Sequence, residues 1–365
     1  MVSMKIGIIL HPYGEGKPAG LGRFIFELTK ALLEADAKNQ YTLFIKEAPE
    51  TAPNFPGTNW KIEILGNSRW WLENLRRYPE VDVYIFNTPV VPLFWRPKKS
   101  VVIAFDFAYK HLTGMSVKER LVARVLEWYH GHSLKKADLI VATSEATKRD
   151  IIRFFKINAD KIRVVYTGFN KICDMVPVAV QVPKPFFLFT GVVKKRKNVL
   201  NIIRGFAEFD KKHSGYNLVI AGSTAGEYAG EARQFVSERG LQEKVLFLGY
   251  VSDPELSFLY KNAAAFVFPS LIEGFIGLPV LEAMDCGLAV LASKESTLAE
   301  VGGKDSAIFV DPNDSADIAA GLFKIVNSEI LKRKLIENGY IVSQRFSWAL
   351  AAKEIKTLAE GLPTF

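Results

Sequence analysis

The sequence predicts an α/β protein with two doubly wound parallel sheets, each in a domain of its own. Three observations lead to this prediction. Short apolar runs of the length of buried strands alternate with helical patterns along most of the chain. The alternation stops once, from Asn170 to Lys184, where Pro177 and Pro183 stand and no helical pattern continues. At 365 residues, the chain is also longer than one hydrophobic core usually supports.

The first half of the chain contains the strands and helices expected of one such sheet. A glycine-bearing loop follows the first strand, and Phe24, Leu28 and Leu32 then form an apolar helical face. Ser144 stands where the N-cap of a helix is expected. The expected strands are 5–10, 41–46, 61–65, 81–86, 101–105, 138–143 and 161–166, and helices are expected at 69–78 and 116–136.

The second half repeats this pattern. It begins with the buried strand 186–191, and Asn198 starts a helix that runs to about His213. Further strands are expected at 217–221, 245–248, 264–268, 289–292 and 307–310, with a last helix at 346–362.

Composition limits the class of protein and its partners. A hydrophobic content of 49% is typical of a globular chain. The net charge of +8 favours an anionic partner, which composition alone leaves open between a sugar nucleotide, a phospholipid surface and a nucleic acid. No motif combines aromatic and basic residues as nucleic-acid binders do, so we expect no nucleic-acid partner.

The cysteines and the apolar runs indicate the compartment. Cys173 and Cys286 are too few for a disulfide framework and fit a reducing environment. Residues 1–10 contain no cleavable apolar core, and no apolar run reaches the roughly 20 residues that span a bilayer. We therefore expect a cytoplasmic protein, with peripheral contact to the inner face of the membrane as an option.

Two positions after strands of the first half are candidate ligand contacts, because doubly wound sheets bind ligands at the carboxyl ends of their strands. The loop from Gly20 to Arg23, with Gly22, opens a helix but lacks the G-x-G-x-x-G spacing, so a tight turn explains it equally well. Asp106 is either a functional carboxylate or a turn carboxylate.

A basic turn follows the first strand of the second half. Four consecutive basic residues, 194–197, lie between Gly191 and the helix that begins at Asn198. Cations beside a helix N-terminus are suited to a diphosphate, since the charges and the helix dipole act together. The alternative is a solvated basic loop.

The stretch from Pro269 to Leu291 contains the most informative residues. Glu273 and Glu282 flank a glycine-bearing loop that leads into a helix, with Pro279 at its start. Free amides at the helix N-terminus and two carboxylates can hold an anion and a polyhydroxylated ligand together. An ordinary strand–turn–helix unit with an exposed glutamate is the alternative.

This stretch resembles the signature E-G-F-G-L-P-x-x-E-A-M-x-C-G of the retaining family 4 glycosyltransferases, which have the GT-B fold. Ile276 is an extra residue, so the loop must bulge. The basic turn resembles the G-x-L-x-x-R-K-N motif of the same family. The matching residues are Gly191, Arg196, Lys197, Asn198, Glu273, Gly274, Phe275, Gly277, Leu278, Pro279, Glu282, Ala283, Met284, Cys286 and Gly287.

The resemblance implies two Rossmann-like domains that face each other across a cleft. Residues 1–172 would form the acceptor-side domain, 173–185 a linker and 186–345 the nucleotide-sugar domain. Residues 346–365 would form a terminal helix that crosses back to the first domain.

The resemblance also implies roles for individual residues. Arg196 and Lys197 would bind the donor diphosphate, Glu273 the transferred sugar and Glu282 the ribose. Asp106 would complete the catalytic set. The remaining donor-binding positions would be Gly22, Val251, Phe275, Ile276, Gly277 and Leu278.

One position departs from the family. Related enzymes commonly carry His-Asp where this chain has Phe105-Asp106, and phenylalanine can neither donate a hydrogen bond nor move a proton. Three explanations remain open: the enzyme works without that contact, another side chain such as His111 supplies it, or activity is impaired.

The function implied is transfer of a sugar, with retention, from a nucleotide-diphosphate sugar to a hydroxyl of a glycan or lipid-linked acceptor. Surface polysaccharide or glycolipid synthesis is the expected setting, with a GDP-mannose-like donor favoured and UDP-sugars next. We expect no metal and no cofactor beyond this co-substrate. The alternatives are a sugar-nucleotide-binding partner subunit with impaired catalysis and a hydrolysing epimerase of the same fold.

Two segments mix bulky apolar and basic residues in the manner of a membrane-facing surface. They are 69–77, with Trp70 and Trp71, and 94–99, with Phe94 and Trp95. Such segments suit an anionic membrane interface. A core-facing helix with solvated arginines is the alternative.

Overall fold

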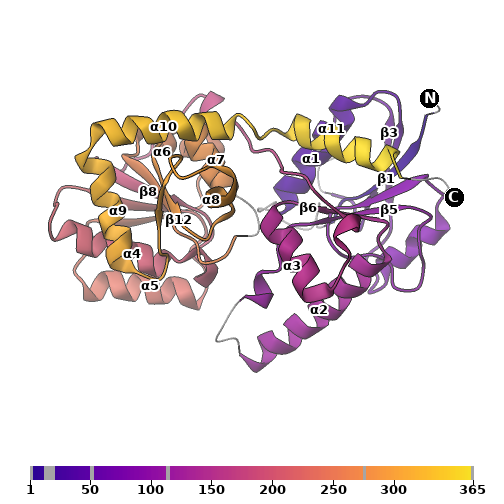
Figure 1. Ribbon diagram of the computed structural model, residues 1–365, viewed down its shortest axis with the longest axis horizontal. Coiled ribbons are helices and arrows are strands. Elements are labelled where there is room, and N and C mark those ends of the chain that lie inside the picture. The colour runs from indigo at the N-terminus through magenta and orange to yellow at the C-terminus, as the bar shows by residue number, and fades with distance from the viewer. Residues whose placement is uncertain (1–2, 12–20, 50–52, 112–115, 274–276, 363–365) are drawn as a thin grey trace. The chain divides into compact units, whose positions relative to one another are not determined.

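The computed structural model describes residues 3–11, 21–49, 53–111, 116–273 and 277–362 (Figure 1). It contains two compact units. The first comprises Met1–Gly168 together with Phe346–Phe365, and the second comprises Phe169–Arg345. The loop predictions at Phe275 and Ile276 lie outside the described residues.

The described part of the first unit is built on a seven-stranded parallel sheet with the order β3-β2-β1-β4-β5-β6-β7. Ile8 of β1 pairs with Leu43 on one side and Ile85 on the other. The strands are β1 Lys5–Ile9, β2 Gln40–Ile45, β3 Trp60–Ile64, β4 Val83–Phe86, β5 Ser100–Ala104, β6 Leu139–Ala142 and β7 Ile162–Val164.

Helices cover both faces of this sheet, as the sequence pattern requires of strands that are apolar on both sides. Ile8 belongs to one apolar cluster with residues of α1 and α11, whereas Ile9 belongs to a second cluster with residues of α2 and α3. The helices are α1 Leu21–Ala35, α2 Val117–Lys136, α3 Glu145–Phe155 and α11 Trp348–Glu360.

The sequence signals for two helix starts are confirmed. The Ser144 side chain accepts a hydrogen bond from the amide of Thr147 at the start of α3. Ser116 and Glu119 form a reciprocal capping box at the start of α2. The last helix, α11, packs against α1, and the rings of Phe24 and Trp348 lie 5.2 Å apart.

The described part of the second unit contains a six-stranded parallel sheet with the order β10-β9-β8-β11-β12-β13. The α/β class with two parallel sheets is therefore confirmed. The strands are β8 Phe186–Thr190, β9 Asn217–Ala221, β10 Val245–Gly249, β11 Ala265–Phe268, β12 Val290–Ser293 and β13 Ile308–Val310. The helices are α4 Val199–Asp210, α5 Glu227–Glu238, α6 Asp253–Asn262, α7 Leu278–Asp285, α8 Thr297–Val301, α9 Ser315–Asn327 and α10 Glu329–Ser343.

The segment expected as a linker, 173–185, lies within the second unit. The amide of Val178 donates to the carbonyl of Pro254, and the Ser257 hydroxyl donates to the carbonyl of Met175. These contacts hold the segment against α6.

The expected helix 69–78 is instead a 3₁₀ helix, η1 Trp71–Arg77. Its N-cap, Trp70, supplies no side-chain hydrogen bond. Leu72 and Leu75 are buried. Residues three apart eclipse in a 3₁₀ helix, so this geometry turns both leucines toward the core.

The expectation that the cysteines form no disulfide is wrong. Cys173 and Cys286 are bonded, with their Cα atoms 5.5 Å apart, and they are separated by 113 positions in the sequence. Cys173 lies in the 3₁₀ turn η4 Ile172–Asp174, which packs against α6 and α7, and Cys286 ends α7. Tertiary packing, which sequence spacing does not reveal, brings the two thiols together.

Candidate functional site

The basic turn of the second unit is held in place by Asn198. This residue has a left-handed backbone conformation, φ 62°, between the 3₁₀ turn η5 Lys195–Lys197 and α4. Its side-chain amide is buried and donates to the carbonyls of Pro269, at 2.9 Å, and Pro312, at 2.6 Å. The turn is thereby fixed against the loops that follow β11 and β13. The sequence predicted Asn198 as the start of a helix and as a match to the basic-turn motif, but not these two hydrogen bonds.

Arg196, Lys197 and Glu273 form one charged cluster. The Lys197 Nζ lies 2.6 Å from Oε1 of Glu273, and Nη1 of Arg196 lies 3.2 Å from the same oxygen. The side chains of Lys197 and Glu273 are only 12% and 9% exposed. Lys197 also lies 4.6 Å above the ring centroid of Phe268 at the end of β11. Because the cluster is mostly buried, salt screens its charges little.

This cluster has the chemistry of an anion site. Two cations and one carboxylate leave one net positive charge among the three side chains. The guanidinium of Arg196 can donate two parallel hydrogen bonds to phosphate oxygens. Glu273 can accept hydrogen bonds from hydroxyl groups while it keeps the two cations in position. The cluster therefore suits a ligand that carries both phosphate and hydroxyl groups.

Glu282 is the second carboxylate of the motif, and it lies on α7 with only 6% of its surface exposed. The hydroxyl of Tyr260, on α6, donates to Oε2 of Glu282 at 3.1 Å. The same hydroxyl lies 3.2 Å from the Thr190 hydroxyl at the end of β8. Tyr260 thus joins Glu282 to the carboxyl end of a central strand.

Sequence reasoning missed Tyr260. It stands in a helix without any motif around it. The available signal was its position next to an apolar run, because a buried tyrosine usually finds a partner for its hydroxyl.

Glycines bring the backbone close together at the carboxyl ends of β8 and β9. Gly191 and Gly222 have φ values of +136° and +137°. A Cβ atom on Gly222 would lie 2.2 Å from the carbonyl oxygen of Gly191, so only glycine fits there. This edge carries the basic turn, as expected of the ligand-binding edge of a parallel sheet.

The other predicted residues of the second unit lie at the ends of its elements. Gly277, φ +87°, is the N-cap of α7, and Leu278 is the first residue of that helix. A Cβ atom on Gly277 would lie 3.1 Å from Cε1 of Phe268. Val251 follows β10 and precedes Ser252, the N-cap of α6.

The candidate residues of the first unit lie at the carboxyl ends of its strands. Gly22 is buried in the first turn of α1. Asp106 follows β5, and its carboxylate accepts from the amide of Ala108 at 3.2 Å, as a turn carboxylate does. The Phe105 ring packs edge-on against Phe24, with centroids 4.4 Å apart.

Two histidines have structural partners within the first unit. The Nε2 atom of His111 lies 2.7 Å from Oδ2 of Asp150. His130 contacts the hydroxyl of Tyr109 at 3.0 Å, and burial lowers the pKa of His130 to about 4. His130 is therefore neutral near pH 7. Among the described residues, no group of three or more His, Cys, Asp or Glu side chains is arranged to hold a metal ion.

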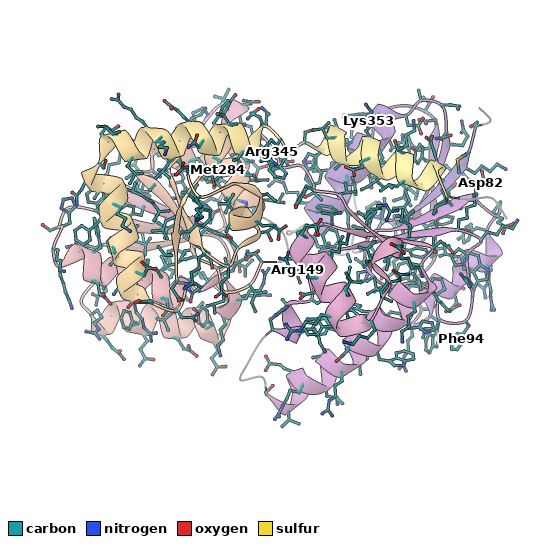
Figure 2. The ribbon with its side chains drawn as sticks, in the orientation of Figure 1. Asp82, Phe94, Arg149, Met284, Arg345 and Lys353 are labelled. Atoms are coloured by element: carbon teal, nitrogen blue, oxygen red, sulfur yellow. A yellow bond between two sulfur atoms is a disulfide. The ribbon has the colours of Figure 1, made fainter. Side chains whose placement is uncertain are left out.

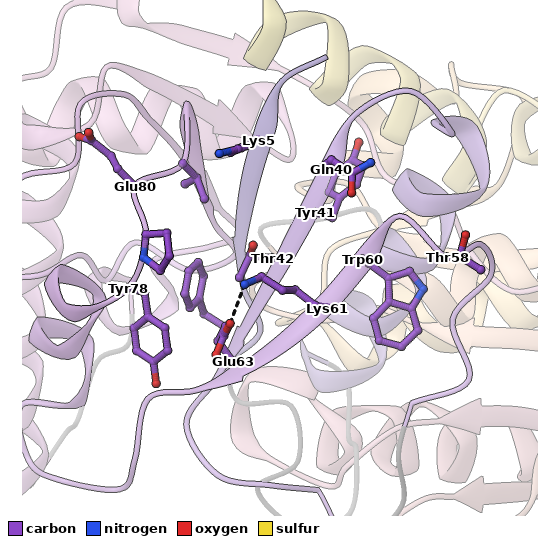
Figure 3. A pocket seen from close by; sticks show the side chains of 13 residues that line it. Lys5, Gln40, Tyr41, Thr42, Thr58, Trp60, Lys61, Glu63, Tyr78 and Glu80 are labelled. Atoms are coloured by element: carbon purple, nitrogen blue, oxygen red, sulfur yellow. Dashed lines mark hydrogen bonds and ion pairs between the residues drawn. The ribbon is translucent and has the colours of Figure 1, made fainter.

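A separate pocket of about 400 Å³ lies in the first unit, against β1, β2 and β3 (Figure 3). It includes Lys5, Gln40 and Trp60, the first residues of these strands. Lys61 and Glu63 form an ion pair at 2.8 Å on its wall. None of the predicted site residues lines it. The lining also includes Thr42, Phe44 and Glu63, so the pocket runs along β2 and β3 rather than at one end of the strands.

Two parallel-sheet units, with an arginine–lysine pair at the carboxyl edge of one sheet, define the class of the GT-B glycosyltransferases. Comparison with known families agrees with this assignment. The model of the glycosyl transferases group 1 matches residues 175–342, and that of glycosyltransferase family 4 matches residues 18–171. The chain belongs to the group 1 glycosyltransferases.

Individual relatives and structures agree with this family. The O-antigen chain mannosyltransferase B of Escherichia coli is 28% identical over 90% of this chain and 92% of its own length. The serotype-specific mannosyltransferase WbdA of Escherichia coli is 31% identical over 74% of this chain, which spans only 34% of that longer relative. The structure of sucrose-phosphate synthase from Thermosynechococcus elongatus superposes with a TM-score of 0.76 at 19% identity, over 98% of this chain and 99% of that one, and shows the shared fold.

Proposed function

We propose that this glycosyltransferase moves a mannosyl residue from a GDP-mannose-like donor to a hydroxyl of a glycan or lipid-linked acceptor in surface polysaccharide synthesis. The cluster of Arg196, Lys197 and Glu273 is the observation that carries the proposal. The mannosyltransferase relatives favour the sugar. UDP-sugars are the next candidates for the donor.

In this mechanism, the bond between the anomeric carbon and the diphosphate oxygen breaks. The acceptor oxygen bonds to the same face of the sugar, so the configuration is retained. The departing diphosphate takes the proton of the acceptor hydroxyl. Arg196 and Lys197 stabilise the charge that grows on the diphosphate, which is usually the largest single contribution in such chemistry. The proposed mechanism uses no metal ion and no further cofactor.

The remaining residues position the donor in this proposal. Glu273 binds hydroxyls of the transferred sugar, and Glu282 accepts two hydrogen bonds from the ribose. The backbone around Gly277 and Leu278 contacts the sugar, and Val251 lies beside the base. In the first unit, Gly22 and Asp106 contribute to binding the donor phosphates and the acceptor.

The first test is a thermal-shift screen of GDP-, UDP-, ADP- and dTDP-sugars against the wild type and the Glu282→Ala variant. We expect GDP-mannose to raise the melting temperature of the wild type by mass action and to have little effect on the variant. Glu337→Ala, on the exposed face of α10, is the matched control and should keep the full shift. A shift with another nucleotide would replace the proposed donor, and no shift with any of them would contradict the donor site.

Retention is tested on the product itself. Once a donor and an acceptor give product, its anomeric configuration can be read by NMR and compared with that of the donor. We expect the same configuration in both. Inversion would exclude the same-face mechanism while leaving the donor site intact.

A third prediction concerns Tyr260. Its hydroxyl orients Glu282, and a hydrogen bond to a charged group is worth roughly 1.5–3 kcal/mol, so Tyr260→Phe should weaken donor binding about tenfold or more. The melting temperature without ligand should also fall by several degrees, because buried Glu282 loses this hydrogen bond, so donor affinity is measured at a temperature where both proteins are folded. Tyr340→Phe, on the partly exposed surface of α10, is the control. Unchanged donor affinity, measured by calorimetry, would show that Glu282 needs no orientation by Tyr260.

A further inference from the structure

Helix α2 of the first unit exposes an unusual number of large apolar side chains. Val117, Leu121, Val125 and Trp128 are 75%, 63%, 60% and 61% exposed. In the whole 20-residue helix, the only buried residues are Ala123, Ser133 and Leu134. Figure 1 shows the N-terminal half of α2 extending beyond the rest of the first unit. An apolar stripe of this size on a surface generally marks an interaction site.

The four side chains lie on one face of the helix. At about 100° per residue, positions 117, 121, 125 and 128 fall within an arc of roughly 80°. Ala123 and Leu134 fall on the opposite side and face the core. The stripe is therefore a continuous outward face rather than a set of scattered residues. Val122, which is also exposed, lies about 60° beyond one edge of the stripe.

Cations flank this stripe on both sides. Arg120 and Arg124 lie along one edge, and Lys118 lies along the other, and all three are exposed. The two carboxylates of α2, Glu119 and Glu127, already have partners. Glu119 accepts from the amide of Ser116, and Glu127 lies 2.6 Å from Lys110 Nζ. The edges of the stripe are therefore positively charged.

We propose that the α2 stripe docks the protein onto an anionic membrane surface. An amphipathic helix with apolar and tryptophan side chains on one face and flanking lysine and arginine lies in the plane of such an interface. Each cation near an anionic leaflet adds to the attraction. Pairing of two copies through this face would instead bring like charges together. The net charge of +8 adds to the attraction toward lipid.

One of the two segments that the sequence predicted for this role, 94–99, is preceded by Val91, which contacts the C-terminal half of α2. The Tyr129 hydroxyl donates to the carbonyl of Val91, and the amide of Val91 donates to the hydroxyl of Ser133. Phe94 is 77% exposed at the surface of the first unit (Figure 2), with its ring 5.6 Å from that of Trp70. This aromatic pair is a second candidate contact, which the experiment must separate from the α2 stripe.

The test is co-sedimentation of the full chain with vesicles. One set contains phosphatidylcholine alone, and the other contains phosphatidylcholine with phosphatidylglycerol. We expect binding to the anionic vesicles only, weakened by salt at about 0.5 M. The double variant L121E/V125E should bind roughly tenfold less or worse, because it puts charges where apolar side chains enter the interface. Both positions are exposed, so the variant should fold.

Matched variants decide the outcome. Ile330→Glu changes an 86% exposed apolar residue of α10 in the same way and should bind like the wild type. Binding that survives in L121E/V125E but is lost in W70S/F94S would overturn the α2 assignment. Equal binding to neutral vesicles would also overturn it. The assignment would also be overturned if the wild type bound no vesicles and formed a dimer in size-exclusion chromatography that depends on Leu121 and Val125.

Discussion

Replacement of Lys197 by alanine is expected to reduce sugar transfer about 100-fold to 1,000-fold. In the proposed mechanism, this ammonium stabilises the diphosphate as it departs, and loss of one preorganised electrostatic donor typically costs that much in kcat. Two cations, Arg196 and Lys197, contact the nearly buried Glu273, and the replacement removes one of them. The initial rate of nucleoside diphosphate release, with the donor found in the binding screen, measures the effect.

The same turn offers a matched control. Lys195 is basic and exposed, two positions from Lys197. Lys195→Ala removes the same charge from the same turn but no contact to Glu273, so its rate should fall less than about threefold. If the two variants lost equal activity, the turn would act only through its overall charge. The specific role of Lys197 would then be wrong.

Replacement of Asp36 by alanine is expected to destabilise the first unit strongly. Asp36 is 2% exposed, and its carboxylate accepts from the hydroxyl of Tyr41 and the side-chain amide of Asn39, both at 2.7 Å. Lys356 of α11 lies 3.5 Å away. Asn39 in turn donates to Glu360 of α11 at 2.8 Å. The network ties the last helix to the loop between α1 and β2.

Removal of this acceptor takes away the carboxylate to which the buried hydroxyl of Tyr41 donates, and it leaves the Asn39 amide with Glu360 as its remaining acceptor in this network. Breaking a buried pair in this way costs about 3–5 kcal/mol, which corresponds to a fall in melting temperature of roughly 10 °C. All six tryptophans lie in the first unit, so their fluorescence reports its unfolding separately from that of the second unit. Asp160→Ala, an exposed aspartate of the same unit, should shift the midpoint little. An equal shift in both variants would contradict the role of the network.

The same carboxylate gives the unit a pH dependence. Burial alone would raise the pKa of Asp36, but hydrogen bonds from Tyr41, Lys38 and Asn39 outweigh it and hold the pKa below its ordinary value of 3.8. The ionised form is therefore favoured by folding. Its contribution is present above the ordinary pKa and is lost as the pH falls through the lower folded pKa.

The melting-temperature difference between the wild type and Asp36→Asn should accordingly shrink as the pH falls below about 4, because asparagine does not titrate. Thermal scans by tryptophan fluorescence between neutral and acidic pH measure this difference. A constant difference across that range would show that Asp36 does not titrate with a lowered pKa.

Much of the architecture could be predicted from local sequence. Buried parallel strands appear in the sequence as short runs of large apolar residues. Ser144 marked the start of its helix, because an N-cap side chain bonds to an amide only three positions further on. The basic turn was likewise recognised as a candidate binding site, because a glycine, several cations and a helix start are adjacent in the chain. Glu273 was recognised because it stands beside a glycine-bearing loop that leads into a helix. The structure adds that the two cations and the carboxylate meet at one oxygen of Glu273.

Other features depend on contacts between distant segments. The choice between an α-helix and a 3₁₀ helix at Trp71–Arg77 depends on which leucines the core accepts, which local pattern does not show. The roles of Tyr260 and Asn198 arise from hydrogen bonds to residues 22 and 71 positions away. The exposed stripe of α2 was missed because an apolar helical face is indistinguishable, in sequence, from one that packs on a sheet.

By itself, the sequence determined the fold class, the family and the charged candidates of the donor site, because these depend on periodicity and on residues that are neighbours in the chain. Only the tertiary structure decided which side chains meet. It paired Cys173 with Cys286, joined Tyr260 to Glu282 and left the face of α2 uncovered. The physical reason is that burial and long-range hydrogen bonds are properties of packed elements, and a single segment does not specify its partner in the core.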